Sequence, residues 1–394
     1  MKPQQYRAFA GLRNDIPEER FAPSDLSVAT NVDTDETGRV YRRRGTVKLA
    51  SGTAVHSLFS DNGLTHYADG SVLYRLNADY TGTSVQTGLT AGAPISYAAV
   101  NGQVYWGNGY QSGVLSSTGN RSFGLAPPVG LAVATTYGSM PAGRYGVAVT
   151  YVRNDGQESG TVAVQVSSLA SMGGLQLSLP VSADPTVTRK NVYMTQTDGE
   201  LPFFQGTYPN GLTTTTITDI QLGVVPLRTL ARGPLPAPRV LAYFNGRLFG
   251  AVGSVIYHSD AYNFELADLK QNMLPFDAQV NMIAPVLDGM YVGTDTGTYF
   301  LSGLDPSEFQ RRLVAPYGTL WGATQLVPGD FVTKEPVAGN VRLWMSKKGP
   351  CFGADGGAFK NMTSTRFIMQ NASYGASLFR STSGTYHFVS SVFA

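Results

Sequence analysis

Residues 286–303 carry the sequence VLDGMYVGTDTGTYFLSG, and this stretch decides the fold that the chain predicts. Asp288 and Gly289 form a strong two-residue turn signal, because glycine adopts positive φ at no steric cost. Residues 290–292 then continue as a short apolar strand, 295–297 turn again, and 298–301 return. The stretch therefore predicts short hairpins, without the spacing of a catalytic motif.

The chain repeats this pattern of a tight turn followed by an aromatic-bearing strand. Two further copies use Asn-Gly turns, at Asn101-Gly102 and Asn245-Gly246. Three weaker copies use Ser-x-x-Gly and end at Gly63, Gly349 and Gly384. Together they give six hairpin turns.

The spacing of these turns indicates the architecture. The intervals are 39 residues from Gly63 to Gly102, 43 from Gly246 to Gly289, and 35 from Gly349 to Gly384. A period of about 40 residues, with four short strands in each, is typical of a β-propeller blade. We therefore predict an all-β protein with a β-propeller of about six blades. The alternative is a generic all-β sandwich with hairpins at chance spacing.

Two intervals break the period. Gly289 and Gly349 are 60 residues apart, which predicts a long loop around residues 316–336. The longer interval, between Gly102 and Gly246, has 144 residues. Residues 142–152 alternate at period two, and Asn154-Asp155-Gly156 follows as a hairpin turn. Proline-rich segments at 125–129 and 232–238 flank the interval, as expected where one domain is inserted into a loop of another. The interval predicts an inserted β-sandwich of about seven strands.

The predicted organisation has four parts. Residues 1–55 form an N-terminal arm with propeller-closing strands, 56–124 the first part of the propeller, 125–232 the inserted sandwich, and 233–394 the second part. A propeller commonly closes by pairing strands from its two ends in one blade. We therefore predict that a strand from residues 29–49 completes the last blade.

Composition agrees with a β-rich chain of two domains. The 394 residues include 45 glycines, 21 tyrosines and 19 phenylalanines, and only 14% are charged. A net charge of +2 predicts no general attraction to polyanions. With Cys351 as the single cysteine, no internal disulfide can form. We expect no signal peptide and no membrane span, since no apolar run reaches the about 18–20 residues required.

Arg42, Arg43 and Arg44 form the densest positive cluster of the chain. Two interpretations are open. Either the charges solvate an edge strand and discourage edge pairing, or they contact nucleic acid or an acidic partner. Three charges that alternate in direction along a strand favour the first interpretation.

The sequence carries no recognisable catalytic or metal-binding constellation. The four histidines are scattered, and no glycine-rich phosphate loop with Lys-Ser/Thr occurs. Cys351 beside Phe352 reads as a buried, inert thiol. We expect a protein that is not an enzyme and needs no cofactor.

Three segments carry a family resemblance. GLRNDIP at 11–17, LSVATNVD at 26–33 and TGRVYRRRG at 37–45 resemble, in this order, the N-terminus of tailed-phage virion proteins. NGRLF at 245–249 and the residues 143–160 add to it, the latter being similar to the immunoglobulin-like or fibronectin-type insertions of such proteins. The chain as a whole resembles the tail nozzle, or tail tube tip, of short-tailed phages.

This resemblance implies a structural role in the virion. In the nozzle family a propeller-bearing subunit forms a ring, typically a hexamer, below the portal and adaptor, and the ring lines the channel through which the genome leaves. The partners implied are other copies of the chain, the tail adaptor or head-to-tail connector, tail fibres or spikes, and phage DNA in transient, non-specific contact. Assembly would take place in the host cytoplasm.

Two other functions stay open. The chain could be a receptor-binding or glycan-binding tail component, which exposed aromatic platforms at Trp106, Trp321 or Trp344 would support. It could instead be a propeller hydrolase that acts on polysaccharide. A hydrolase needs carboxylates clustered at the centre of the ring, for which Asp260, Asp288 and Asp295 are candidates.

Overall fold

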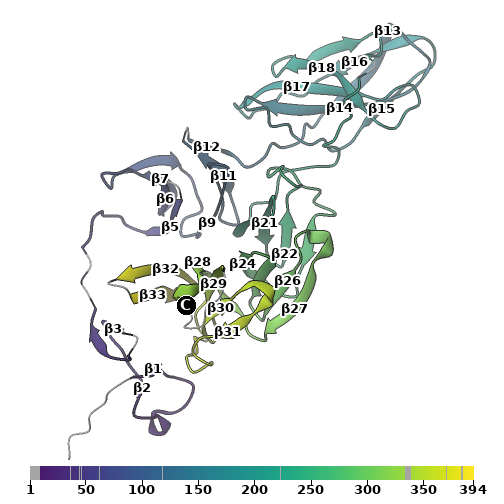
Figure 1. Ribbon diagram of the computed structural model, residues 1–394. Helices are drawn as coiled ribbons and strands as arrows, with labels where there is room; N and C mark the ends of the chain where they lie inside the picture. The colour runs from purple at the N-terminus through teal and green to yellow at the C-terminus, as the bar shows by residue number, and fades with distance from the viewer. Residues whose placement is uncertain are drawn as a thin grey trace, which may run out of the picture.

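The computed structural model describes residues 9–35, 37–43, 45, 47–61, 63–117, 119–221, 223–332, 339–369, 371–382 and 385–394. Within these residues the regular structure is β-strand, apart from four short 3₁₀ turns. Figure 1 shows a group of small sheets, a sandwich that projects from it, and an N-terminal arm at the opposite end. The prediction of an all-β fold is confirmed.

Four four-stranded antiparallel sheets and the four antiparallel strands β28–β31 of a six-stranded sheet form five blades of the propeller. Blade 1 contains β5 (Val55–Asp61), β6 (Leu64–Asp69), β7 (Val72–Leu76) and β8 (Gly82–Gln86), and blade 2 contains β9 (Ser96–Val100), β10 (Gln103–Gly107), β11 (Ser112–Ser116) and β12 (Gly119–Ser122). Blade 3 contains β20 (Val240–Phe244), β21 (Arg247–Val252), β22 (Val255–His258) and β23 (Met273–Pro275), and blade 4 contains β24 (Val280–Val286), β25 (Gly289–Thr294), β26 (Thr298–Ser302) and β27 (Gln310–Ala315). Blade 5 contains β28 (Thr319–Pro328), β29 (Asn340–Ser346), β30 (Gly349–Gly353) and β31 (Phe359–Asn361).

The sixth position holds a hairpin of β32 (Tyr374–Thr382) and β33 (Thr385–Phe393), whose strand β32 pairs with β28. Apolar clusters fill the spaces between successive sheets, for example Trp106 and Leu73 between blades 1 and 2, and Trp344 and Tyr291 between blades 4 and 5. Blades 2 and 3 are neighbours although the sandwich separates them in sequence, since Leu241 donates its N–H to Ser96 Oγ at 2.9 Å. Five blades of four strands are thus followed by a two-stranded hairpin, which the parallel pairing of β32 with β28 joins to the sheet of blade 5.

The Asn-Gly turns form as predicted. Asn101 and Gly102 have φ of 51° and 73°, and Asn245 and Gly246 have 41° and 77°. Positive φ at both central residues is the geometry that suits the twist of a hairpin. The hairpin at 286–303 also forms, but Val286 pairs with Gly289, so its turn residues are Leu287 and Asp288. Gly289 already belongs to β25, where a Cβ would collide with the carbonyl oxygen of Leu301.

The inserted sandwich has seven strands in two antiparallel sheets. One sheet has the order β13 (Ala132–Met140), β16 (Gly173–Ser178), β19 (Thr214–Ile217), and the other β15 (Gln165–Leu169), β14 (Gly143–Arg153), β17 (Val187–Met194), β18 (Phe203–Pro209). Tyr145, Val147 and Val149 point from β14 into the core between the sheets, as the alternation predicted. The strands lie inside the interval 125–232.

The predicted closing strand is wrong for the described residues. β3 (Val32–Thr34) pairs with β4 (Val40–Arg42) in a separate two-stranded sheet, and residues 47–54 contain no strand. The turn between them is closed locally, since Asp35 Oδ1 accepts hydrogen bonds from the N–H groups of Thr37 and Arg39. At this point the arm contacts the last hairpin through an ion pair, in which Arg380 Nη2 lies 3.1 Å from Asp33 Oδ2.

Two buried histidines predict sensitivity to acid. His66 on β6 and His258 on β22 are 1% and 7% exposed, and burial lowers the pKa of each below the ordinary 6.5. A proton therefore binds the unfolded chain more readily, so stability is full above pH of about 6.5 and falls as the pH drops below it. We expect the melting temperature to fall from pH 7.5 to 5, and to fall less in a His66→Gln variant than in a His387→Gln control. Equal slopes in the two variants would contradict this assignment.

Candidate functional site at the junction of the domains

The junction between sandwich and propeller is built around one buried carboxylate. Glu265, in the loop between β22 and β23, is 3% exposed. Its oxygens accept hydrogen bonds from Arg121 on β12, at 2.6 and 2.9 Å, and from Arg153 at the end of β14, at 3.0 Å. The N–H of Gly124 in the first linker also donates to it, at 3.0 Å. One side chain of blade 3 therefore ties together blade 2, the linker and the sandwich.

The charges of this cluster, on Glu265, Arg121 and Arg153, are largely buried and paired with one another. The Arg153 side chain is fully buried, and its Nη2 donates to Ser122, whose hydroxyl donates to Asp184 Oδ2 at 2.7 Å. Burial works to lower the pKa of Arg121, but the hydrogen bond and the charge of Glu265 outweigh it and raise that pKa. Burial, aided by the charge of Glu265, raises the pKa of Tyr105. Each cation thus depends on the same carboxylate.

The return linker is fixed separately. Arg232 lies between two carboxylates, with Nε at 2.8 Å from Asp260 and Nη1 at 2.8 Å from Asp268. Asn272 also donates to Asp260, at 2.9 Å, and Gly233 pairs its backbone with Ala267. Both passages of the chain between the domains are therefore anchored on the β22–β23 loop.

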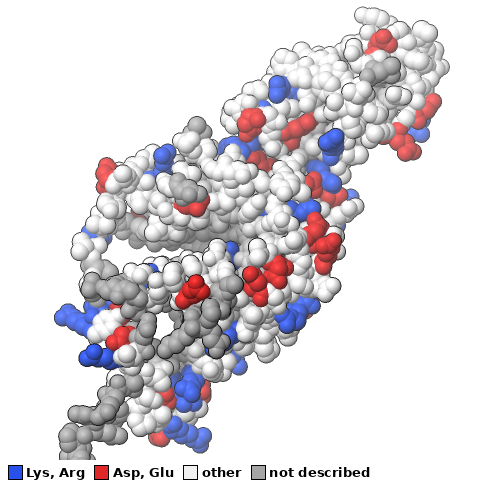
Figure 2. Space-filling view, in the orientation of Figure 1, with Lys and Arg blue, Asp and Glu red and all other residues white. Residues whose placement is uncertain are grey.

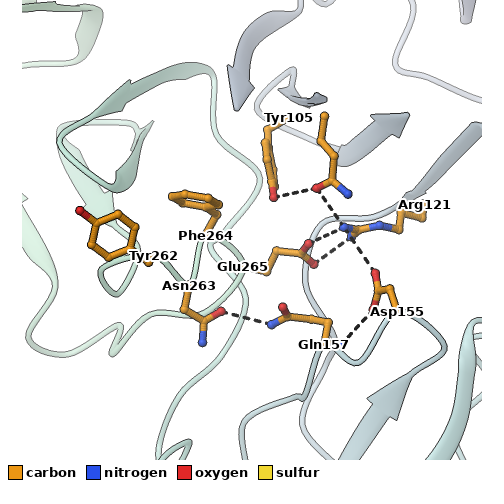
Figure 3. A pocket seen from close by; sticks show the side chains of 9 residues that line it. Tyr105, Arg121, Asp155, Gln157, Tyr262, Asn263, Phe264 and Glu265 are labelled. Atoms are coloured by element: carbon orange, nitrogen blue, oxygen red, sulfur yellow. Dashed lines mark hydrogen bonds and ion pairs between the residues drawn. The ribbon is translucent and has the colours of Figure 1, made fainter. Parts of the chain in front are cut away.

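A cavity of about 250 Å³ opens beside Glu265. Its walls come from blade 2, the β14–β15 loop and the β22–β23 loop. Figure 3 shows Glu265 and Arg121 at the centre of the lining and Tyr262 at its edge, with the tyrosine hydroxyl directed outward. The lining residues are Gln103, Tyr105, Arg121, Asp155, Gln157, Tyr262, Asn263, Phe264 and Glu265. The cavity joins aromatic rings to amides and charged groups.

The arginine cluster of the N-terminal arm lies elsewhere. Arg42 is exposed on β4, and the Arg43 N–H donates to the Asn31 carbonyl at 3.0 Å. Neither guanidinium forms an ion pair within the described residues, and Arg44 lies outside them. Arg42 and Arg43 are thus available for a partner but take no part in the junction.

The three tryptophans are buried, with exposed fractions of 1% for Trp106, 6% for Trp321 and 0% for Trp344. Trp106 donates its indole N–H to Asn120 at 2.8 Å, and Trp321 donates to the Arg239 carbonyl at 3.0 Å. The sequence suggested them as exposed platforms for a glycan, and the structure corrects this. They fill the spaces between blades.

The three candidate carboxylates of a hydrolase do not meet. Asp288 precedes β25 and Asp295 follows it, so a strand of six residues separates them by roughly 20 Å. Asp295 accepts a hydrogen bond from Asn281 at 2.7 Å, Asp288 from the Gly356 N–H at 2.8 Å, and Asp260 is paired with Arg232. Each carboxylate holds a local turn or linker.

Within the described residues no three His, Cys, Asp or Glu side chains are grouped as metal ligands. Cys351 is buried, and burial raises the pKa of its thiol to about 11. In the same part of the chain, no helix is long and apolar enough to cross a membrane.

The junction cluster was not predicted from the sequence. Glu265 lies 144 residues from Arg121 and 112 from Arg153, on three different elements. The one available signal was Arg153 itself, a charged residue that ends the apolar run of β14. A charged residue at this position is equally typical of the exposed start of a turn.

Comparisons with known proteins identify no family. No protein-family model matches the chain, and no curated protein matches it. Among solved structures, a chain of BBS1N in complex with ARL6DN is 12% identical, with a TM-score of 0.34, over 87% of this chain and 94% of that one. Puromycin hydrolase is 13% identical, with a TM-score of 0.23, over 84% of this chain and 57% of its own.

Proposed function

We propose that the chain is a structural component of a bacteriophage tail, in the simplest case the nozzle subunit that forms a ring-shaped channel for genome retention and ejection. The observation that carries this proposal is the double anchoring of the sandwich on blade 3. Domains joined by two linkers move relative to each other by default. Here the buried carboxylate of Glu265 holds the first linker and the partly exposed ion pairs of Arg232 hold the return linker, which suits a subunit that must keep its shape within an assembly.

Two further features support the proposal. The motifs at 11–17, 26–33 and 37–45 resemble the N-terminus of phage virion proteins in their order. Figure 2 shows charged side chains of both signs scattered over this face of the molecule, with most of the surface uncharged. A channel for DNA benefits from this, because many strong phosphate contacts would hold the duplex in place. Arg42 and Arg43 remain the proposed points of contact with DNA or an acidic neighbour.

Electron microscopy of intact particles tests the proposal. Particles of the source phage are treated with gold-labelled antibody against this chain. Label at the distal end of a short tail, with rings of the purified protein in negative stain, is the expected result. Label confined to lateral fibres or spikes, or absent from every particle, would overturn the nozzle assignment.

A glycan-binding role is the second candidate. The tryptophans do not support it, but the junction cavity does, through its mixture of aromatic and amide side chains. The positions of Asp260, Asp288 and Asp295 give the hydrolase candidate no comparable support.

A further inference from the structure

The rim of the junction cavity contains a strained aromatic residue. Tyr262 has a φ of 56°, in the left-handed region that bulky residues rarely occupy, and its side chain is 80% exposed. Its N–H donates to the Gly246 carbonyl at 2.7 Å, and its ring packs flat against Gly246, where a Cβ would lie 3.0 Å from two ring atoms. Neither burial nor core packing explains a large ring held in this backbone geometry. Such strain is typical of functional positions.

The cavity also presents polar groups that have no hydrogen-bond partner within the described residues. Gln157 Nε2 donates to Asn263 Oδ1 at 3.2 Å, which leaves Gln157 Oε1 as a free acceptor and Asn263 Nδ2 as a free donor. Gln103 accepts from Tyr105 and Arg121 through Oε1, so its Nε2 is free as well. Asp155 Oδ2 lies 3.8 Å from Arg121, beyond hydrogen-bond distance. Donors and acceptors therefore alternate around one small space.

The charges of the lining disfavour an anion. Arg121 is the one cation of the lining, and Glu265 already holds it with two hydrogen bonds. Asp155, whose side chain is 41% exposed, adds a carboxylate that would repel a second anion. The volume of about 250 Å³ lies below the about 300 Å³ at which pockets for drug-sized ligands begin, and therefore suits a single small ring.

From these features we propose that the junction cavity binds a neutral pyranose, such as the terminal sugar of a surface glycan. The hydroxyls of a sugar both donate and accept, which matches Asn263, Gln157 and Asp155. The C–H face of the pyranose stacks on the free face of Tyr262, whose other face Gly246 covers. The ion pairs of Glu265 already order the side chains that line the cavity, so sugar binding does not lose conformational entropy by ordering them. This site goes beyond the structural role proposed above, and it rests on the second candidate function, glycan binding, for which it names the ligand class.

Ligand-observed NMR with the full-length protein tests the site. Saturation transfer is measured for methyl glycosides of glucose, galactose and mannose, for N-acetylglucosamine, and for glucuronic acid as an anionic probe. The expected result is transfer to at least one neutral sugar, strongest at the C–H face of its ring. No transfer to any neutral sugar at millimolar concentration, or transfer to glucuronic acid alone, would overturn the proposal.

Two variants separate binding from folding. Tyr262→Gly removes the stacking ring but also relieves the left-handed backbone, since glycine adopts positive φ freely. We expect it to weaken sugar binding at least tenfold while the melting temperature stays equal or rises. Asn263→Ala should weaken binding as well, whereas Tyr110→Ala, which removes a ring that is 71% exposed in the β10–β11 turn, should leave it unchanged. Unchanged binding in Tyr262→Gly, or equal loss in Tyr110→Ala, would contradict the site.

Discussion

Replacing Glu265 by alanine is expected to lower the free energy of unfolding by about 3–5 kcal/mol, because the change leaves the buried guanidinium of Arg153 without a counter-charge. Arg121 loses two hydrogen bonds and the Gly124 N–H loses its acceptor in the same step. The sandwich should also loosen from the propeller. Chemical denaturation measures the first effect, and hydrogen exchange at the Gly124 amide the second.

Asp155→Ala is the matched control for this prediction. It removes the other carboxylate near Arg121, but that side chain is 41% exposed and lies 3.8 Å away. Exposed pairs contribute between about 0 and 1 kcal/mol, so a small change is expected. Equal losses in the two variants would show that the junction does not depend on the buried carboxylate.

The blades were predictable because their signals are local. Asn101-Gly102 and Asn245-Gly246 specify a hairpin whatever surrounds them, since asparagine and glycine are the residues that accept positive φ at both turn positions. The proline-rich linkers and the alternation in 142–152 are local as well. Asp288-Gly289 shows the limit of this reasoning. The hairpin forms, but the turn lies one residue earlier, because Gly289 is required for the close approach of β26.

The junction and the end of the ring were not predictable for the same reason. Glu265, Arg121 and Arg153 meet only through the packing of three elements, and no pattern within one segment reports such a contact. The prediction of a closing strand was wrong because β3 and β4 pair with each other. Asp35 stabilises the turn between them by accepting hydrogen bonds from two backbone N–H groups. The prediction that the tryptophans are exposed platforms was wrong because large aromatic rings fill the spaces between blades. Which residues face those spaces depends on how the blades pack, and the local sequence does not show it.

Trp344→Ala is expected to lower the free energy of unfolding by about 3–5 kcal/mol, the loss typical of a large aromatic side chain removed from a core. Trp344 is 0% exposed, and its ring centroid lies 5.2 Å from that of Tyr291 and 5.8 Å from that of Phe359. The backbone at Gly353 approaches the indole so closely that a Cβ there would lie 2.9 Å from it. Alanine would leave a void between blades 4 and 5 that these rigid neighbours cannot fill.

Trp344→Phe sharpens this prediction. The indole N–H of Trp344 is buried and has no hydrogen-bond partner in the part of the chain that the structure describes, and such an unsatisfied donor costs about 1–3 kcal/mol. Phenylalanine removes that donor while it keeps one ring in the space, so its loss should be well below that of alanine. Leu287→Ala, at a side chain that is 80% exposed in the β24–β25 turn, is the surface control and should change stability by less than about 0.5 kcal/mol. If Trp344→Phe and Trp344→Ala lowered the free energy of unfolding equally in denaturation, the void would not explain the loss. The contact between blades 4 and 5 would then depend on the indole itself.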